Sequence, residues 1–474
     1  MNEQAAVEAP AGVRSNEPNE PNEAASRHGR APAGRIRPAS RLRGELRLPG
    51  DKSISHRALL LAAIAEGESR IAGAGDGADV RSTAAVIEAL GAVVERASDG
   101  RPTVDYRVVS PGANGLREPD DVLDCGNSGT TLRLTTGMLA GLPLTAVLTG
   151  DASLRRRPVA RIIEPLRSMG AVLHARRHDS LPPVTVVGRT PLRAIDAWTP
   201  VPSAQVKSAI LLAGLRAEGR TTVREAVATR DHTERMLRAR GVPVDREAVD
   251  GPSGQGVAWS LEGMANVRAE NERVPGDVSA AAFWLVAAAI HPDAKLTLRD
   301  VGVNPTRRAV IDLLRRMGAN IDEVIGRSDD GIGEPTADLV ARSSALESIE
   351  LGPADVAAAI DEVPILCLAA TQARGTTVIR GAGELRHKES DRLAGIAVGL
   401  AALGADVELR GDELRISGPT RLHGAVTDSL ADHRLAMTFA VAGLIARGET
   451  VVLRPDSATV SYPGFFDELE GVGA

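Results

Sequence analysis

Residues Pro49–Gly67 read PGDKSISHRALLLAAIAEG. From Ala58 to Ala65 every residue is apolar, which predicts a helix that is buried on all sides. Lys52, two serines, a histidine and Arg57 stand in front of this run, although its packing needs none of them. Cationic side chains also lie at the unfavourable end of the helix dipole there. An anion bound at the helix start would make the arrangement favourable, so the stretch predicts a buried helix and an anion site.

The same kind of helix recurs along the chain. Each copy opens with small or polar residues, and the copies begin near Ser53, Asn127, Ser203, Asp277, Asp361 and Asp432, at intervals of roughly 71 to 84 residues. A second series interleaves with the first and consists of a helix end, a glycine and a β-like run, at Gly91, Gly170, Gly241, Gly318 and Gly404. Glycine at this place is typical of a left-handed helix cap. Because both series keep register, they predict an α/β protein built from six repeat units.

Composition excludes several classes of protein. The chain has 474 residues, 43% hydrophobic and 25% charged, which is ordinary for a soluble globular protein of two or more domains. A net charge of −6 gives no general basic field for nucleic acid, and the apolar run Ala280–Ile290 is too short to span a membrane. Cys125 and Cys367 form no disulfide framework, so a cytoplasmic location is expected.

The N-terminal residues 1–37 differ from the rest. They include NEPNEPNE and are rich in Pro, Asn and Glu, with few bulky apolar residues. Such a segment cannot bury enough surface to offset the entropy of ordering, so we expect a disordered tail.

Polar motifs mark the helix starts. They are Lys52–Arg57, Asp124–Arg133 (DCGNSGTTLR), Arg155–Pro158, Ser203-Ala204-Gln205, Asp361-Glu362, Arg386–Arg392 (RHKESDR) and Asp432-His433-Arg434. Each one alone is also consistent with an ordinary helix cap or with solvated charges. The first is not an ATP-binding loop, because Asp51 separates Gly50 from Lys52.

The stretch RHKESDR is the most specific of these motifs. Lys388 and Arg392 are four residues apart and are expected on one helical face, where like charges are unfavourable by a few tenths of a kcal/mol. A bound phosphate or carboxylate would reverse that sign, and Glu389 beside them can carry a proton. The alternative is a surface helix with ion pairs.

Taken together, the chain resembles the enolpyruvyl transferases, most closely those that act on shikimate 3-phosphate. The resemblance covers about residues 38–466 and depends on PGDKSISHRALLLAA, CGNSGTTLR, LTGDASLRRRP, the Ser203-Ala204-Gln205 turn, IDEVPIL, ELRHKESDRL and ADHRLAM, in that order. It implies an α/β fold, a two-domain inside-out α/β barrel of six βαβαββ units with three per domain. One domain would be 51–273, and the other would combine 38–50 with 274–474.

The reaction that the resemblance implies is transfer of the enolpyruvyl group of phosphoenolpyruvate to the 5-hydroxyl of shikimate 3-phosphate. It runs by addition and elimination, with no metal or other cofactor. A monomer is expected, with these two small molecules as partners and no nucleic acid or membrane. Inhibition by glyphosate in competition with phosphoenolpyruvate is also expected, because Gly129 leaves room that any side chain would fill.

The same resemblance implies roles for individual residues. The catalytic groups would be Asp361, which takes the 5-hydroxyl proton, Glu389, which shuttles a proton at the vinyl carbon, and Lys52 and Lys388, which assist. Shikimate 3-phosphate would be bound by Lys52, Ser53, Arg57, Ser203, Ala204, Gln205, Thr229, Asp361 and Lys388. Phosphoenolpyruvate would be bound by Lys52, Gly129, Arg157, Gln205, Arg392 and Arg434.

Three positions depart from the family pattern. Val460 stands where a lysine is often found, Glu384 where the family has an asparagine, and His232 where a tyrosine sometimes occurs. Two other functions are alternatives: the sibling transferase that acts on UDP-N-acetylglucosamine, and a non-catalytic protein that binds a phosphorylated sugar acid. The sibling's first motif has Lys-Asn and its loop carries a cysteine, whereas Lys52 precedes Ser53 here and Cys125 looks like a buried strand-end residue.

Overall fold

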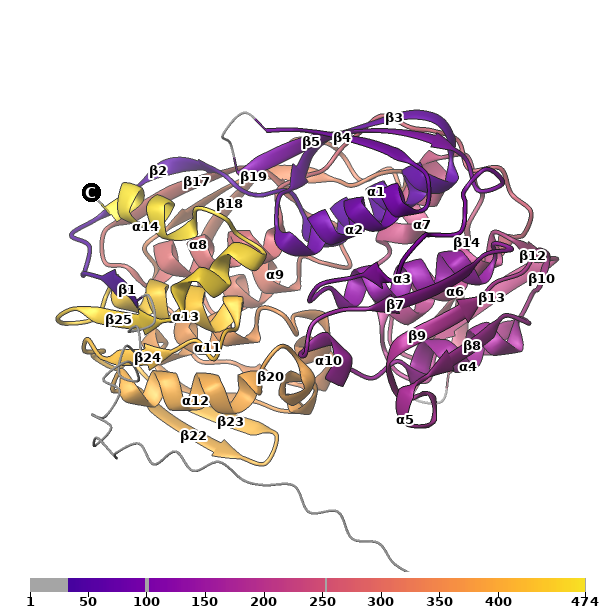
Figure 1. Cartoon of the computed structure of the whole chain (residues 1–474). Helices are drawn as coiled ribbons and strands as arrows, with labels where there is room; N and C mark the ends of the chain where they lie inside the picture. The colour runs from indigo at the N-terminus through magenta and orange to yellow at the C-terminus, as the bar shows by residue number, and fades with distance from the viewer. Residues whose placement is uncertain (1–32, 99–101, 252–253, 474) are drawn as a thin grey trace, which may run out of the picture.

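The computed structural model describes residues 33–98, 102–251 and 254–473, which form two lobes lying side by side (Figure 1). The buried apolar side chains fall into two separate clusters. One draws on residues 54–274, and the other on residues 36–48 together with 278–472. Each lobe therefore has its own hydrophobic core, and the chain contributes to the second core from both of its ends.

Three apolar helices fill each core. In the first they are α1 (Lys52–Ile64), α3 (Gly129–Ala140) and α6 (Ala204–Gly214), with α3 packed against both of the others. In the second they are α8 (Val278–Ile290), α11 (Val363–Gln372) and α13 (His433–Gly443), which pack on one another. These are the six helices that the apolar runs predict, and their starts lie within two residues of the expected positions.

Each of these helices packs against strands of its own small sheet. In the first lobe the sheets are β16(Glu272–Arg273)-β3(Glu66–Gly75)-β5(Thr103–Pro111)-β4(Val93–Ala97), β6(Leu123–Asp124)-β7(Thr145–Thr149)-β9(Leu181–Val187)-β8(Val172–Ala175), and β11(Asp196–Trp198)-β13(Arg220–Glu225)-β15(Gly254–Glu262)-β14(Asp245–Gly251). A two-stranded pair, β10 (Leu192–Arg193) and β12 (Ala217–Glu218), adds to them.

The second lobe repeats this order. Its sheets are β2(Leu42–Arg47)-β17(Ala294–Gly302)-β19(Thr336–Arg342)-β18(Asn320–Ile325), β20(Glu350–Leu351)-β21(Gly375–Ile379)-β23(Glu413–Gly418)-β22(Asp406–Arg410), and β24(Val426–Asp428)-β25(Thr450–Leu453)-β1(Ala33–Ile36). In every sheet of three or four strands the first two strands are parallel and the others antiparallel. The repetition that the sequence predicts is therefore visible in the topology.

Shorter or more amphipathic helices connect the strands. They are α2 (Ala78–Ala89), α4 (Ala160–Ser168), α5 (Arg176–Asp179), α7 (His232–Ala239), α9 (Ala309–Arg316), α10 (Pro353–Ala358), α12 (Arg392–Ala402) and α14 (Phe465–Gly473), with 3-10 turns η2 (Leu154–Arg156), η3 (Gly383–His387) and η4 (Pro455–Val460). The glycines at 91, 170, 241, 318 and 404 all have positive φ, between 80° and 105°, which confirms the predicted helix caps. In the described ranges no helix has the length and hydrophobicity needed to cross a bilayer.

The chain passes between the lobes at two adjacent segments. Strand β2 precedes α1 in the sequence but pairs with β17, whereas β16 precedes α8 but pairs with β3. The two connections run side by side, since the Asp51 amide donates to the Pro275 carbonyl at 2.8 Å and the Asp277 amide donates to the Pro49 carbonyl at 2.9 Å. The starts of α1 and α8 therefore lie next to each other.

The disordered tail predicted for residues 1–37 extends several residues too far along the chain. Strand β1 pairs antiparallel with β25, and Ile36 is buried in the second core. The expectation of disorder is wrong for residues 33–37, because one apolar side chain and a free strand edge are enough to order the segment. Residues 1–32 lie outside the described part of the chain.

Candidate active site

The starts of α1 and α8 meet where the chain crosses between the lobes. Asp51 caps α1 by accepting from the Ile54 amide at 3.0 Å, and Asp277 caps α8 by accepting from the Ser279 amide at 2.7 Å. The other oxygen of Asp277 accepts from the Lys52 amide at 3.4 Å. Helix N-termini from both lobes thus meet in one region, where the carboxylates of Asp51 and Asp277 accept from their amides.

The first two turns of α1 direct two cations to this region. Lys52 Nζ lies 3.2 Å from Asp79 Oδ2, at the start of α2. The Arg57 guanidinium is almost fully buried and donates to the carbonyl of Ser53 at 2.9 Å. Burial lowers the pKa of Arg57 to about 10, and the neighbouring cation Arg230 acts in the same direction while Glu234 opposes it.

The start of α3 supplies a second group of contacts. Arg133 Nη1 donates to Gln205 Oε1 at 2.6 Å, and Gln205 Nε2 donates to Thr130 Oγ1 at 2.9 Å. A Cβ at Gly129 would lie 2.8 Å from Arg133 Nη1 and 3.6 Å from Arg157 Nη1. Gly129 therefore sits directly beneath two arginines, and Gln205 is held by the same network.

The second lobe contributes a cluster of charges around Asp361. Lys388 Nζ lies 3.3 Å and Arg392 Nη1 lies 3.5 Å from Asp361 Oδ1. Arg392 also donates through Nε to Asp432 at 2.8 Å and pairs with Glu389. Arg434 lies 3.8 Å from Glu362. The predicted residues of the second lobe are thus in one place.

Two ion pairs join the lobes across the site. Arg157 Nη1, which follows η2, lies 3.7 Å from Glu389 Oε1, and Arg230 Nη2, just before α7, donates to Asp361 Oδ2 at 2.7 Å. Both expected proton-transfer residues therefore contact a cation of the opposite lobe. The groups predicted from distant parts of the sequence come together between the lobes.

The charges in this cluster determine the protonation states. Burial alone would raise the pKa of Asp361, but Lys388, Arg434, Arg230 and Arg392 together hold it well below its usual range. Burial acts on Glu389 in the same way, and Arg392, Arg157 and Lys52 hold the pKa of that carboxyl well below its usual range. Both carboxylates are ionised at neutral pH.

The pKa of His433 is also lowered, but here burial is the main cause. Burial, with the nearby cation Lys52, lowers the pKa of His433 to about 3, although Asp432 opposes this. Its imidazole is therefore neutral at pH 7. Buried cations and carboxylates are therefore closely interleaved in this cluster.

The remaining predicted residues have simpler contacts. Ser203 is the N-cap of α6 and accepts from the Val206 amide at 3.5 Å, which is the cap that its position also predicts. Ala204 and Gln205 form the first turn of that helix and are partly exposed. The Thr229 hydroxyl bonds to Glu225 and lies next to Arg230 in the chain.

The prediction that Lys388 and Arg392 share one helical face is wrong. Helix α12 begins only at Arg392, and Lys388 follows the 3-10 turn η3 in an extended conformation. The Asp391 side chain caps α12 by accepting from the Ala394 amide at 3.0 Å, which fixes the helix start after the lysine. Lys388 and Arg392 converge on Asp361 from a turn and a helix end.

Arg230, Asp79 and His433 belong to the cluster but were not among the predicted site residues. Arg230 stands in the charged run TRDHTER at the start of α7, of which the sequence analysis names only Thr229 and His232. That run at a helix start was the available signal. Asp79 carries no local signal, because its pairing with Lys52 depends on how α1 and α2 pack.

The three departures from the family pattern also have definite places. The carbonyl of Val460 would lie 2.3 Å from a Cβ at Gly77, so η4 packs tightly on the start of α2. His232 Nδ1 lies 2.7 Å from Glu334 Oε1 of the opposite lobe. Glu384 is in η3, where its charge opposes the effect of burial on the pKa of Arg161, which remains lowered.

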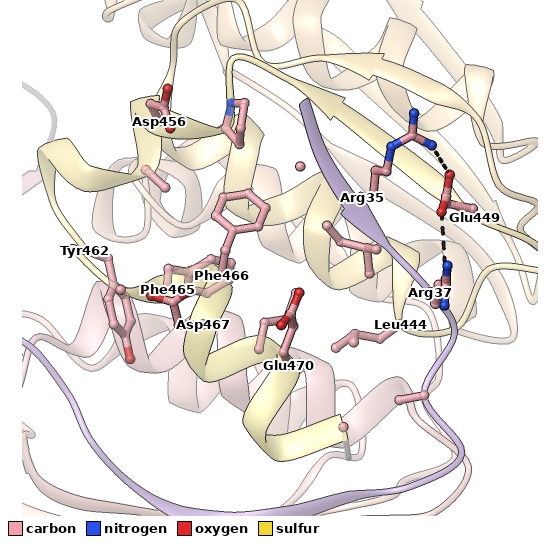
Figure 2. A pocket seen from close by; sticks show the side chains of 18 of the residues that line it. Arg35, Arg37, Leu444, Glu449, Asp456, Tyr462, Phe465, Phe466, Asp467 and Glu470 are labelled. Carbon is pink, nitrogen blue, oxygen red and sulfur yellow. Dashed lines mark hydrogen bonds and ion pairs between the residues drawn. The ribbon is translucent and has the colours of Figure 1, made fainter. Parts of the chain in front are cut away.

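A large cavity lies elsewhere, on the second lobe. It measures about 740 Å³ and runs between β1 and α14, with Arg35, Glu449, Tyr462 and Phe466 among its lining residues (Figure 2). None of the predicted site residues lines it. The charged cluster between the lobes, not this cavity, is therefore the candidate active site.

Comparisons with known proteins identify the family of this chain. A family model for EPSP synthase (3-phosphoshikimate 1-carboxyvinyltransferase) matches residues 36–469. The 3-phosphoshikimate 1-carboxyvinyltransferase of Gloeobacter violaceus is 54% identical over 438 residues, which are 92% of this chain and 98% of that protein. The enzyme of the same name from Anaeromyxobacter sp. (strain Fw109-5) is 53% identical over 436 residues, covering 91% and 96%.

Solved structures give the same result. An EPSP synthase structure from Acinetobacter baumannii superposes with a TM-score of 0.81 at 40% identity, covering 93% of this chain and 98% of that one. The enolpyruvyl transferase NikO from Streptomyces tendae shares the fold, with a TM-score of 0.72 at 20% identity over 93% and 97% of the two chains. The chain thus belongs to the EPSP synthase family, and its homologues are 3-phosphoshikimate 1-carboxyvinyltransferases over almost their whole length.

Proposed function

We propose that the chain transfers the enolpyruvyl group of phosphoenolpyruvate to the 5-hydroxyl of shikimate 3-phosphate, in the cluster between the two lobes. The observation that carries this assignment is the pairing of both proton-transfer carboxylates with arginines of the opposite lobe, Arg157 with Glu389 and Arg230 with Asp361. Two anionic substrates bound between the lobes would pair with the cations gathered there from both lobes.

In the addition step, Asp361 accepts the proton of the 5-hydroxyl as its oxygen bonds to C2 of phosphoenolpyruvate. Glu389 donates a proton to C3, and Lys388 assists both transfers. In the elimination step, C3 returns its proton to Glu389, the C2–O bond to phosphate breaks, and phosphate leaves with the proton held by Asp361. Asp361 enters the first step as a carboxylate, because the cations around it hold its pKa low and keep it ionised.

Glu389 has to be protonated to act, although the charges around it favour the carboxylate. Phosphoenolpyruvate bound by Arg157 and Arg392 would neutralise the two arginines that hold the pKa of Glu389 down. Burial would then dominate and raise the pKa, so that substrate binding itself prepares the acid. Lys52, Gly129, Gln205 and Arg434 complete the phosphoenolpyruvate site in this proposal.

Shikimate 3-phosphate takes the other side of the cluster. Its phosphate and its carboxylate would bind Ser53, Arg57 and the α6 start at Ser203, Ala204 and Gln205, with Thr229 nearby. Its 5-hydroxyl would face Asp361 and Lys388, and Lys52 would contact both substrates. The buried Arg57 and the N-terminus of α6 support this placement, since both favour an anion.

The proposal includes the architecture and the setting. The two cores and the exchange of β2 and β16 support a two-domain inside-out α/β barrel of six βαβαββ units, with residues 51–273 as one domain and 38–50 with 274–474, now extended by β1, as the other. We place the protein in the cytoplasm as a monomer. Its two cysteines are buried thiols whose pKa burial raises to about 12.

Steady-state phosphate release from the purified full chain tests the function. Phosphate should form continuously with phosphoenolpyruvate and shikimate 3-phosphate, and not when UDP-N-acetylglucosamine replaces the latter. Tight binding of shikimate 3-phosphate without turnover would instead identify a non-catalytic binding protein.

A further inference from the structure

Arg57 is a buried cation that lacks a carboxylate partner. Its exposed fraction is 4%, and among the residues that the structure describes no Asp or Glu oxygen lies within 4.0 Å of its guanidinium. A buried charge normally needs a partner of opposite sign, and Lys207 in the same lobe has two, Glu225 and Glu234. Arg57 must be stabilised in another way.

Two hydroxyl groups take the place of the carboxylate. Arg57 Nε donates to Thr233 Oγ1 at 2.7 Å, and Nη2 donates to Ser208 Oγ at 2.9 Å. The two hydroxyl oxygens are 2.7 Å apart and hydrogen-bonded to each other. Both side chains are fully buried, Ser208 in α6 and Thr233 in α7. The guanidinium of α1 is thus clamped along one edge by two neighbouring helices.

The donors that remain are those a ligand would use. A guanidinium carries five N–H groups. Thr233 and Ser208 take two of them, and the Ser53 carbonyl takes one on Nη1 at 2.9 Å. One N–H is left on each terminal nitrogen, which suits the oxygens of a phosphate. Because the three acceptors are uncharged, they orient the guanidinium without cancelling its charge.

We propose that Thr233 and Ser208 are positioning residues, which orient Arg57 and keep its charge available for an anionic group of shikimate 3-phosphate. The inference rests on the proposed function, in which Arg57 binds shikimate 3-phosphate. A carboxylate at either position would pair with Arg57 and compete with the ligand, whereas an apolar side chain would leave Nε or Nη2 without an acceptor.

The test compares isosteric variants by binding and kinetics. Thr233→Val removes the hydroxyl and keeps the shape, Thr233→Ser keeps the hydroxyl, and Ser208→Ala removes its partner. Thr221→Val is the matched control, because the Thr221 hydroxyl is equally buried in the same lobe and has no hydrogen-bond partner among the described residues. Titration calorimetry gives the Kd for shikimate 3-phosphate, and steady-state kinetics give kcat and the KM for each substrate.

We expect Thr233→Val and Ser208→Ala to raise the Kd and KM for shikimate 3-phosphate about 10-fold, as for the loss of one hydrogen bond to a charged group. The KM for phosphoenolpyruvate and kcat should change less than about twofold, a margin well below that tenfold loss. Thr233→Ser should restore the wild-type Kd, and Thr221→Val should leave it unchanged. In an Arg57→Ala background, Thr233→Val should cause no further loss.

A melting temperature that falls while the Kd for shikimate 3-phosphate stays the same would overturn the inference. So would an additive loss in the Arg57→Ala background, because the hydroxyl would then act on something other than Arg57. Neither result would affect the proposed function as long as the wild-type chain turns over both substrates. Conversely, binding without turnover in the wild type would contradict the proposed function. The comparison of Kd values would then still decide whether Thr233 and Ser208 position Arg57.

Discussion

Arg157 Nη1 lies 3.7 Å from Glu389 Oε1, although the two residues belong to different lobes. With Arg392 and Lys52, this arginine outweighs the effect of burial and holds the pKa of Glu389 well below its usual range. The acid that the proposed reaction needs is therefore ionised in the empty site. An anion that occupies Arg157 and Arg392 changes that balance, which makes the protonation of Glu389 a property of the bound state.

Binding of phosphoenolpyruvate should therefore be accompanied by proton uptake at Glu389. Calorimetry at pH 7 in buffers of different ionisation enthalpy measures this, with a shikimate 3-phosphate analogue lacking the 5-hydroxyl present to prevent turnover. We expect the wild type to take up as much as about one proton more than Glu389→Gln does, because only the wild type has this carboxylate. Equal uptake by the two proteins would show that Glu389 does not change its protonation state.

Glu389→Gln should lower kcat by ~10²–10⁴-fold, the range expected when an acid–base group is lost. The Kd for shikimate 3-phosphate should stay near the wild-type value, because Glu389 faces Arg157 and Arg392 on the phosphoenolpyruvate side. Glu164→Gln, an exposed position on α4, serves as the control and should leave kcat unchanged. An unchanged kcat in Glu389→Gln would exclude this residue from the proton transfers.

The sequence predicts which residues lie at this site, but it does not predict which of them contact one another. The apolar runs predict the six buried helices, and the polar residues at their starts, such as Lys52 and Asp361, lie at the site. Pairings across the lobes, such as Arg230 with Asp361, depend on the path of the chain through β2 and β16, which has no local signal. Resemblance to a family supplied the roles, whereas spacing alone placed Lys388 and Arg392 on one helix, which is wrong.

Asp361 should make stability depend on pH. Its pKa is well below the ordinary value in the folded state, so it stabilises the fold above the unfolded pKa, and that contribution is lost as pH falls through the folded pKa. Asp361→Asn should therefore be less stable than the wild type at pH 7, and the difference should shrink from about pH 5 downward, by up to ~1.36 kcal/mol per pH unit.

Urea unfolding of both proteins at a series of pH values between 7 and 3 measures that difference. Asp456→Asn is the control, because Asp456 is exposed on η4 and forms no ion pair among the described residues. A difference between Asp361→Asn and the wild type that stays constant over this range would mean that Asp361 titrates normally.

Gly129→Ala should weaken the phosphoenolpyruvate site. The added Cβ would lie 2.8 Å from Arg133 Nη1, and Arg133 would have to leave Gln205 to make room. Loss of such a hydrogen bond predicts a rise of about 3- to 10-fold in the KM for phosphoenolpyruvate. We expect glyphosate to compete with phosphoenolpyruvate in the wild type and to inhibit Gly129→Ala less, because the same space is filled.

Gly352→Ala is the matched control for that variant. A Cβ at Gly352 would meet no atom within 4 Å, and its φ of −81° suits alanine. Steady-state kinetics with and without glyphosate compare the three proteins. An unaltered KM for phosphoenolpyruvate in Gly129→Ala would show that the space beneath Arg133 and Arg157 is not part of the site.

Where the sequence failed, the missing information was tertiary. The tail was expected to reach residue 37, because Ala33–Ile36 has no strong strand pattern of its own. Its order comes from the free edge of β25 and from the pocket that receives Ile36. Likewise, Thr233 and Ser208 are unremarkable in the sequence, and only the packing of α1, α6 and α7 brings them to Arg57.

The central claim is that dispersed cations and helix starts form one site for two anions between the lobes. A crystal structure of the full chain with shikimate 3-phosphate tests it most directly. We expect the phosphate or the carboxylate of shikimate 3-phosphate within hydrogen-bond distance of Arg57 and Ser53, and the 5-hydroxyl facing Asp361 and Lys388. Shikimate 3-phosphate bound instead in the outer cavity beside Arg35 and Glu449, with the cluster between the lobes empty, would contradict it.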